Sequence, residues 1–149
     1  MQLEQEIHQK HFRNEWQKGV VNILFTHSWL STQIKEFLKP YAITPQQYNV
    51  LRILRGQYPQ PISTSVIRER MLDKMSDISR MVDRLQQKDL IIRTASTTDR
   101  RLVDVVISPK GLDLLAELDK HNVQMDSILQ NLSKEEATQL NHLLDKIRD

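Results

Sequence analysis

The hydrophobic residues of this chain change their spacing twice, and that change limits the folds the chain can adopt. Up to residue 88 they recur every three or four residues, as on one face of an α-helix. Residues 90–94 and 102–107 are rich in β-branched side chains and fit the twofold period of strands, and from residue 109 the helical spacing returns. The pattern predicts a mainly α protein with one small β-hairpin, in the order α-α-α-α-β-β-α-α.

The first predicted helix, over residues 6–38, is long for a chain of 149 residues. Its stripe recurs at steps of three and four residues and consists of Trp16, Val20, Leu24, His27, Leu30, Ile34 and Leu38. Pro40 ends the helix. Because one subunit can hardly bury so long a stripe, we expect part of it to pack on a partner chain.

Capping signals mark where later helices begin. Thr44 is an N-cap, Pro45 occupies the first helical position and Gln47 completes a capping box, which predicts a helix over residues 44–56. Periodic apolar residues and further caps predict four more helices, at 63–71, 75–88, 109–131 and 133–147.

Two short helices joined by a brief turn and followed by a hairpin make up a winged helix-turn-helix. The connection between the two strands, residues 95–101, is polar and basic, so its tip should project into solvent. We therefore predict one unit over residues 1–149, with the winged helix-turn-helix at about 41–108.

The second helix of this motif carries the candidate DNA contacts. Its core face is predicted to be Ile78, Val82 and Leu85, which leaves facing outward Ser76, Ser79, Arg80, Asp83, Arg84 and Gln87. Arg80 and Arg84 lie four residues apart on one face, so each can reach a guanine edge or the phosphate backbone. Ser76 and Ser79 are small enough to let the backbone approach a groove, and their hydroxyls can bond phosphates or base edges.

The charge distribution is compatible with a polyanionic partner. Residues 62–110 hold ten Lys and Arg against seven Asp and Glu, a net charge of +3, whereas the rest of the chain holds 11 against 12. Arg100 and Arg101, at the tip of the hairpin, would lie beside the same duplex, where a minor groove concentrates negative potential. An ordinary mixed-charge surface explains a difference of this size equally well, so charge alone does not identify the partner.

Three segments resemble the MarR family of transcriptional regulators. The predicted recognition helix, Ile78-Ser79-Arg80-Met81-Val82-Asp83-Arg84-Leu85, follows that family's order of an apolar residue, Thr/Ser-Arg, two apolar positions and Asp-Arg-Leu. The other two segments are similar to the family's Asp-x-Arg wing and to the opening of its next helix, and they read Asp99-Arg100-Arg101 and Ser108-Pro109-Lys110-Gly111. The likeness covers nearly the full chain, because the flanking helices match in number and length.

The resemblance assigns roles to individual residues. The DNA contacts it implies are Ser76, Ser79, Arg80, Arg84, Asp99, Arg100 and Arg101. It implies that Asp99 orients Arg101 for the minor groove, and that Asp83 holds a nearby arginine, since a carboxylate facing phosphate would be repelled. Asp89 departs from the family's usual glycine, and we expect it to adopt left-handed backbone angles with modest strain.

The resemblance also implies how the protein works. It implies a cytoplasmic homodimer, built by dimerisation helices at about 1–40 and 109–149, with a DNA-binding region at about 41–108. This homodimer is expected to act as a ligand-responsive, sequence-specific repressor on double-stranded DNA. Twofold symmetry then predicts a pseudo-palindromic operator with half-sites about 10 base pairs apart. The alternative is a dimeric winged-helix module that binds another protein and has lost DNA reading, and the complete set of arginines argues against it.

A small acid is the effector class that the resemblance implies, and three residues are candidates to bind it. They are His27, Trp16 and Trp29, all on the first predicted helix. Aromatic residues and a histidine on an apolar stripe are also what a helical core or a subunit interface contains. Both interpretations remain open at the level of the sequence.

Several classes of site are excluded or disfavoured. The chain has no cysteine, which excludes disulfides, thiolate metal sites and thiol redox sensing, and its three glycines form no phosphate-binding loop. His8, His11 and Glu15 would share one helix face and could ligate zinc, but solvated side chains near a frayed terminus are the simpler interpretation. No apolar run approaches the roughly 20 residues of a membrane span. We expect no enzyme activity, cofactor or bound metal.

Overall fold

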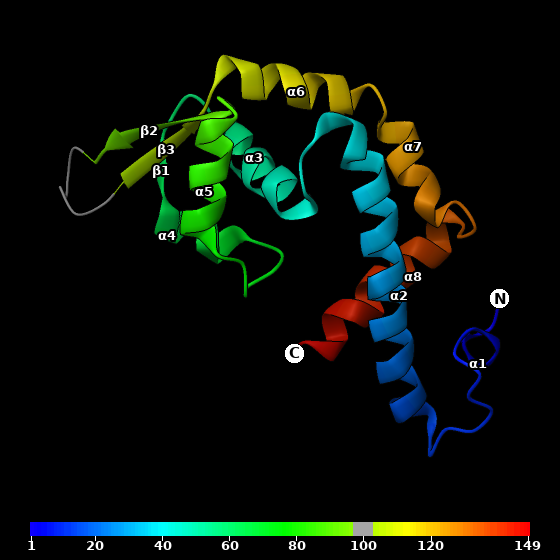
Figure 1. Cartoon of the computed structure of the whole chain (residues 1–149). Helices are drawn as coiled ribbons and strands as arrows, with labels where there is room; N and C mark the ends of the chain where they lie inside the picture. The colour runs from blue at the N-terminus through cyan, green and yellow to red at the C-terminus, as the bar shows by residue number, and fades with distance from the viewer. Residues whose placement is uncertain (97–102) are drawn as a thin grey trace.

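The structure of the chain is a computed structural model, which describes residues 1–96 and 103–149. In Figure 1 the helix-turn-helix and its small sheet lie on one side, and the helices α2, α7 and α8 lie on the other. Helix α6 bridges the two parts. The predicted mainly helical, winged helix-turn-helix architecture is confirmed.

The elements follow the predicted order, with several short elements added. The helices are α1 (Leu3–Glu6), α2 (Glu15–Leu38), η1 (Lys39–Tyr41), α3 (Pro45–Gln57), α4 (Thr64–Arg70), α5 (Ile78–Gln87), α6 (Pro109–Asp119), α7 (Asn122–Asp126), η2 (Ser127–Leu129) and α8 (Lys134–Ile147). The strands are β1 (Ile62–Ser63), β2 (Ile91–Ala95) and β3 (Val103–Ile107). None of the helices in the described part of the chain combines the length and the apolar character that crossing a membrane requires.

The predicted hairpin is one part of a three-stranded antiparallel sheet. Its order is β1-β3-β2, with Ile91 opposite Ile107 in one pair and Ile62 opposite Val105 in the other. The sequence pattern did not predict β1, because two residues are too few to show the twofold period of a strand.

The core lies where the helix-turn-helix packs against β3 and α6. Its fully buried side chains include Leu51, Leu54, Ile67, Val82, Leu85, Val105, Ile107, Leu115 and Leu118. Ile78, Val82 and Leu85 form the buried face of α5, as predicted. At about 25 cal/mol per Å² of apolar area removed from water, this burial is what fixes α5 on the domain.

The first predicted helix is wrong at its N-terminal end. Helix α2 begins at Glu15, because the side chain of Asn14 accepts a hydrogen bond from the Gln17 amide at 2.9 Å and caps the helix there. His8 has a positive φ of 54°, which takes it out of any helix. His8, His11 and Glu15 therefore do not share a helix face, and the described residues contain no cluster of metal-ligating side chains.

The predicted helix over residues 109–131 is also wrong, because it is broken after Asp119. The last turn of α6 tightens into hydrogen bonds three residues apart, from the Lys120 amide to the Glu117 carbonyl at 3.2 Å and from the His121 amide to the Leu118 carbonyl at 3.0 Å. Histidine and asparagine, which follow at positions 121 and 122, are weak helix formers. The chain then continues as α7 and η2 at a new angle (Figure 1).

Candidate nucleic-acid interface

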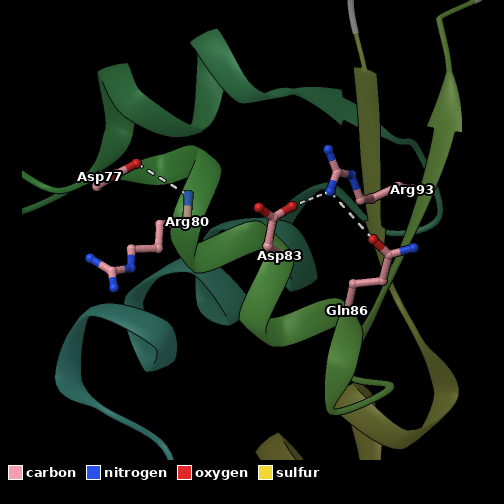
Figure 2. Close-up of polar contacts among 5 residues, drawn as sticks. All are labelled: Asp77, Arg80, Asp83, Gln86 and Arg93. Atoms are coloured by element: carbon pink, nitrogen blue, oxygen red, sulfur yellow. Dashed lines mark hydrogen bonds and ion pairs between the residues drawn. The ribbon is translucent and has the colours of Figure 1, made fainter.

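Helix α5 begins at Ile78, three residues later than the predicted start. Asp77 is its N-cap, and the Arg80 amide donates a hydrogen bond to the Asp77 carboxylate at 3.1 Å (Figure 2). A carboxylate here also interacts favourably with the positive end of the helix dipole. The cap fixes the first turn of α5, from which Ser79 and Arg80 project.

The turn between α4 and α5 is fixed by side chains from both sides. The Leu72 amide donates to the Asn49 side chain on α3 at 2.9 Å, and the Met75 amide donates to the Asp73 carboxylate at 2.9 Å. The Lys74 ammonium donates to a carbonyl at the end of α4, that of Glu69. These contacts hold the angle between the two helices of the motif and so the direction in which α5 points.

The predicted DNA contacts on and before α5 differ in their exposure to solvent. Ser79, Arg80 and Arg84 are exposed on the helix, as predicted. Ser76 precedes the helix and is half-buried, and its hydroxyl oxygen is shielded from solvent without a hydrogen-bond partner among residues 1–96 and 103–149. The prediction that Ser76 faces outward is therefore wrong, because the late start of α5 leaves it in the turn.

The predicted wing contacts, Asp99, Arg100 and Arg101, lie outside the described residues. The strands that lead to them are described, and the β2–β3 pairing extends to Ala95 opposite Val103. The roles of the three wing residues stay predictions.

Arg93 on β2 connects the sheet to the recognition helix. Its guanidinium donates to the Asp83 carboxylate and to the Gln86 side chain oxygen, the latter at 3.4 Å (Figure 2). The expectation that Asp83 holds a nearby arginine is confirmed. The sequence does not single out Arg93 as that arginine, because the pair joins two elements whose relative position the sequence pattern does not give.

A corner between α5 and β2 attaches the recognition helix to α6. Asp89 adopts φ 59°, in the left-handed region, as expected from its place in the sequence. The Ser108 hydroxyl, at the N-cap of α6, donates to the Asp89 carbonyl at 2.6 Å, and the Lys110 ammonium donates to the Lys88 carbonyl at 2.9 Å. Gly111 allows this close approach, since a Cβ there would lie 2.4 Å from the Leu90 carbonyl oxygen.

The three candidate effector residues do not meet within one chain. Trp16 is 82% exposed near the start of α2. His27 lines a hollow of about 560 Å³ between α2, α3 and the α4–α5 turn, whereas Trp29 lines a separate hollow of about 420 Å³ between α2 and the α7–η2 segment. A shared effector site for them stays a prediction, and it would need a contribution from a second copy of the chain.

Known proteins are similar to this chain in sequence and in fold. Residues 43–103 match the MarR family model. The HTH-type transcriptional repressor MdtR of Bacillus subtilis (strain 168) is 34% identical over 120 residues, which cover 79% of this chain and 76% of MdtR.

Two solved structures have the same fold. A mutant MarR from E. coli complexed with operator DNA has a TM-score of 0.82 at 24% identity, and the match covers 93% of this chain and 99% of that chain. Bordetella bronchiseptica BpsR, whose DNA binding is regulated by 6-hydroxynicotinic acid, has a TM-score of 0.76 at 22% identity, with 88% of this chain and 99% of BpsR covered. Together with the match to MdtR, these likenesses complete the case made by the helix-turn-helix: the chain belongs to the MarR family of transcriptional regulators.

Proposed function

We propose that this protein is a cytoplasmic, homodimeric transcriptional repressor that reads double-stranded DNA with α5 and releases it when a small molecule binds. The observation that supports DNA reading most directly is the pair of exposed arginines, Arg80 and Arg84, on a helix fixed at both ends. Asp77 holds its start, and the Ser108 corner holds its end. Side chains on so constrained a helix can select bases, because their positions are set before DNA binds.

Exposed apolar surface outside the reading head supports the homodimer. On α2, Trp16, Val20 and Leu24 are 82%, 59% and 64% exposed, and on α8 Leu143 and Ile147 are 48% and 65% exposed. Large apolar side chains exposed in this way outside the reading head are typical of a protein–protein interface. A second copy that covers them would place two α5 helices on one duplex and so require a pseudo-palindromic operator.

The relatives support the remaining parts of the proposal. MdtR is named as a repressor, MarR of E. coli has been solved on operator DNA, and 6-hydroxynicotinic acid regulates DNA binding by BpsR. Repression, DNA binding and response to a small acid are therefore what we propose for this chain. The proposal includes no catalysis and no cofactor.

The test is a titration of a fluorescent 30-base-pair duplex of random sequence at several salt concentrations. The log of the binding constant should fall linearly with the log of salt concentration, with a slope of about −0.9 for each phosphate neutralised. Arg100→Ala should make this slope less steep by about 1, if its side chain reaches a phosphate. A protein that is folded and dimeric but does not bind duplex DNA at low salt would contradict the proposal and favour a protein-binding module.

A further inference from the structure

Two connections join the reading head (α3, α4, α5 and the sheet) to the helices that carry the exposed apolar surface. The first runs from α2 through η1 to α3, and its Ala42 has a φ of 54°, in the left-handed region. The ammonium of Lys88, just after α5, donates to the Ala42 carbonyl and holds this connection to the recognition helix. The second connection is α6, which in Figure 1 runs from the sheet to α7.

An ion pair between Arg55 and Asp119 holds the second connection. Arg55 is on α3, and Asp119 is the last residue of α6. The Arg55 guanidinium donates from Nη1 to Asp119 Oδ2 at 2.6 Å and from Nη2 to Asp119 Oδ1 at 3.3 Å, so the contact is bidentate. A bidentate contact between a guanidinium and a carboxylate fixes orientation as well as distance.

Asp119 lies where the buried part of α6 ends. Leu118 is fully buried in the core, whereas residues 119–124 are exposed. The amides of Lys120 and His121 donate to carbonyls only three residues back, which is a poorer hydrogen-bond geometry than that of the α-helix. The chain is therefore easiest to bend just after the core, and the ion pair fixes its direction at that point.

The ion pair is better suited to fixing an angle than to stabilising the fold. Both side chains are partly exposed, so solvent screens the attraction between them. The apolar side chains that α3 and α6 bury in one core, such as Leu54 and Leu115, already hold the two helices together. What the pair adds is a directional restraint where the chain leaves the core.

We infer that Arg55 and Asp119 fix the angle of each reading head on the dimer and so determine which half-site spacing the protein accepts. In the proposed dimer the two α5 helices are joined through α6 and the terminal helices, so the angle at Asp119 sets their separation and relative rotation on the duplex. One added base pair moves a half-site by about 3.4 Å and rotates it by about 35° around the duplex axis. The inference rests on the proposed function, because a half-site spacing exists only for a dimer on DNA.

The test compares the binding of full-length protein to duplexes that differ only in half-site spacing. Their inverted repeat is the one that the wild type selects from random duplexes, at its selected spacing and with one base pair added or removed between the half-sites. The wild type should prefer the selected spacing at least about tenfold, and Arg55→Gln should reduce this preference to about threefold or less. A wild type without such a preference, or an Arg55→Gln variant that weakens binding to all three spacings by one factor, overturns the inference.

Two further variants separate geometry from charge. Lys120→Gln is the matched control, because it removes the same charge beside Asp119 but breaks only the pair with Glu117, at 2.6 Å within one turn. It should leave the spacing preference unchanged, and an equal loss of preference in this control overturns the inference. Arg55→Lys keeps the charge but cannot make the bidentate contact, so its spacing preference should fall as in Arg55→Gln. A full preference in Arg55→Lys overturns the role of the bidentate geometry.

Removal of the carboxylate tests the pair from its other side. Asp119→Asn should lose the same spacing preference as Arg55→Gln, and the double variant should lose no more than either single variant, because all three remove one contact. Additive losses overturn the assignment to this pair. A folded wild-type dimer that selects no inverted repeat contradicts the proposed function itself. Selection of a repeat by the wild type, with an unchanged spacing preference in Arg55→Gln, overturns only the role of the ion pair.

Discussion

At the scale of single residues, the pair formed by Asp83 and Arg93 sets the electrostatics of the recognition helix. The side chains are 58% and 31% exposed, so the ion pair is partly solvated and contributes little to stability by itself. We expect its larger effect on DNA binding, because it neutralises a carboxylate on the helix that we propose reads DNA. Arg93 came to light only from the structure, since the sequence gives no distance between β2 and α5.

Removing Arg93 should therefore impair DNA binding more than it impairs folding. Arg93→Gln leaves the Asp83 carboxylate unpaired, so the affinity for duplex DNA should fall. Arg93→Gln/Asp83→Asn should recover part of that affinity, because the repulsive charge is gone. The coupling energy of the pair in urea unfolding should be about 0.2–1 kcal/mol. If the double variant binds DNA more weakly than Arg93→Gln, Asp83 has another role.

Gly111 is a second position where one atom matters. Gly111→Ala should lower the free energy of unfolding by about 1–3 kcal/mol, since the new Cβ would lie 2.4 Å from the Leu90 oxygen and 2.6 Å from Ile107 Cγ1. Gly56→Ala is the control, because its Cβ meets no atom within 4 Å. That helical substitution should raise the free energy of unfolding by about 0.4–1 kcal/mol. Denaturant unfolding at one protein concentration compares the two, and equal effects would contradict the close approach.

At the scale of elements, helix starts were predicted well where the signal lies within one turn of the chain. Capping boxes at Thr44 and Ser133 start α3 and α8 where the sequence indicated, because an N-cap and its partner lie within one turn. The errors at the start of α2 and at the end of α6 arose where a continuous apolar stripe hid a break. Asn14 caps α2 and so fixes its start, and the hydrogen bonds of the Lys120 and His121 amides end α6. The periodic pattern of apolar residues continues across both positions.

The cap of α5 is the element-scale feature that links stability to DNA reading. Asp77→Ala should lower the free energy of unfolding by about 1 kcal/mol, because the Arg80 amide loses its acceptor. Asp77→Asn keeps an oxygen acceptor and should cost much less. Thermal unfolding separates the two, and a loss as large in Asp77→Asn as in Asp77→Ala would show that charge rather than capping is what Asp77 supplies.

At the scale of the whole molecule, the proposed DNA reading requires a second copy of the chain. The apolar stripe of α2 is buried at Leu38, but its N-terminal part, with Trp16, Val20 and Leu24, remains exposed in the single chain. The sequence could predict that such a face exists from its period, but not which residues of the partner cover it. A repressor that reads a pseudo-palindrome needs this face to be occupied.

Charge placed on that face should separate the subunits. Leu24 is 64% exposed in the single chain and is expected to be buried in the dimer interface. Leu24→Glu would bury an unpaired carboxylate there, which is costly, so the dimer should dissociate on dilution. Asn22→Glu adds the same charge at an exposed polar position of the same helix and should leave the dimer intact. Analytical ultracentrifugation measures both, and a dimer in the Leu24→Glu variant would place the interface elsewhere.

Sequence-specific DNA reading by α5 is tested most directly by selecting the purified protein against a library of random duplexes. The wild type should enrich an inverted repeat whose half-sites lie about 10 base pairs apart. Arg80→Ala/Arg84→Ala should lose that enrichment, whereas Arg13→Ala/Arg148→Ala, which removes two arginines outside the reading head, should keep it. If the wild type enriches no sequence, or if the α5 variant enriches the same repeat, α5 is not the element that reads DNA.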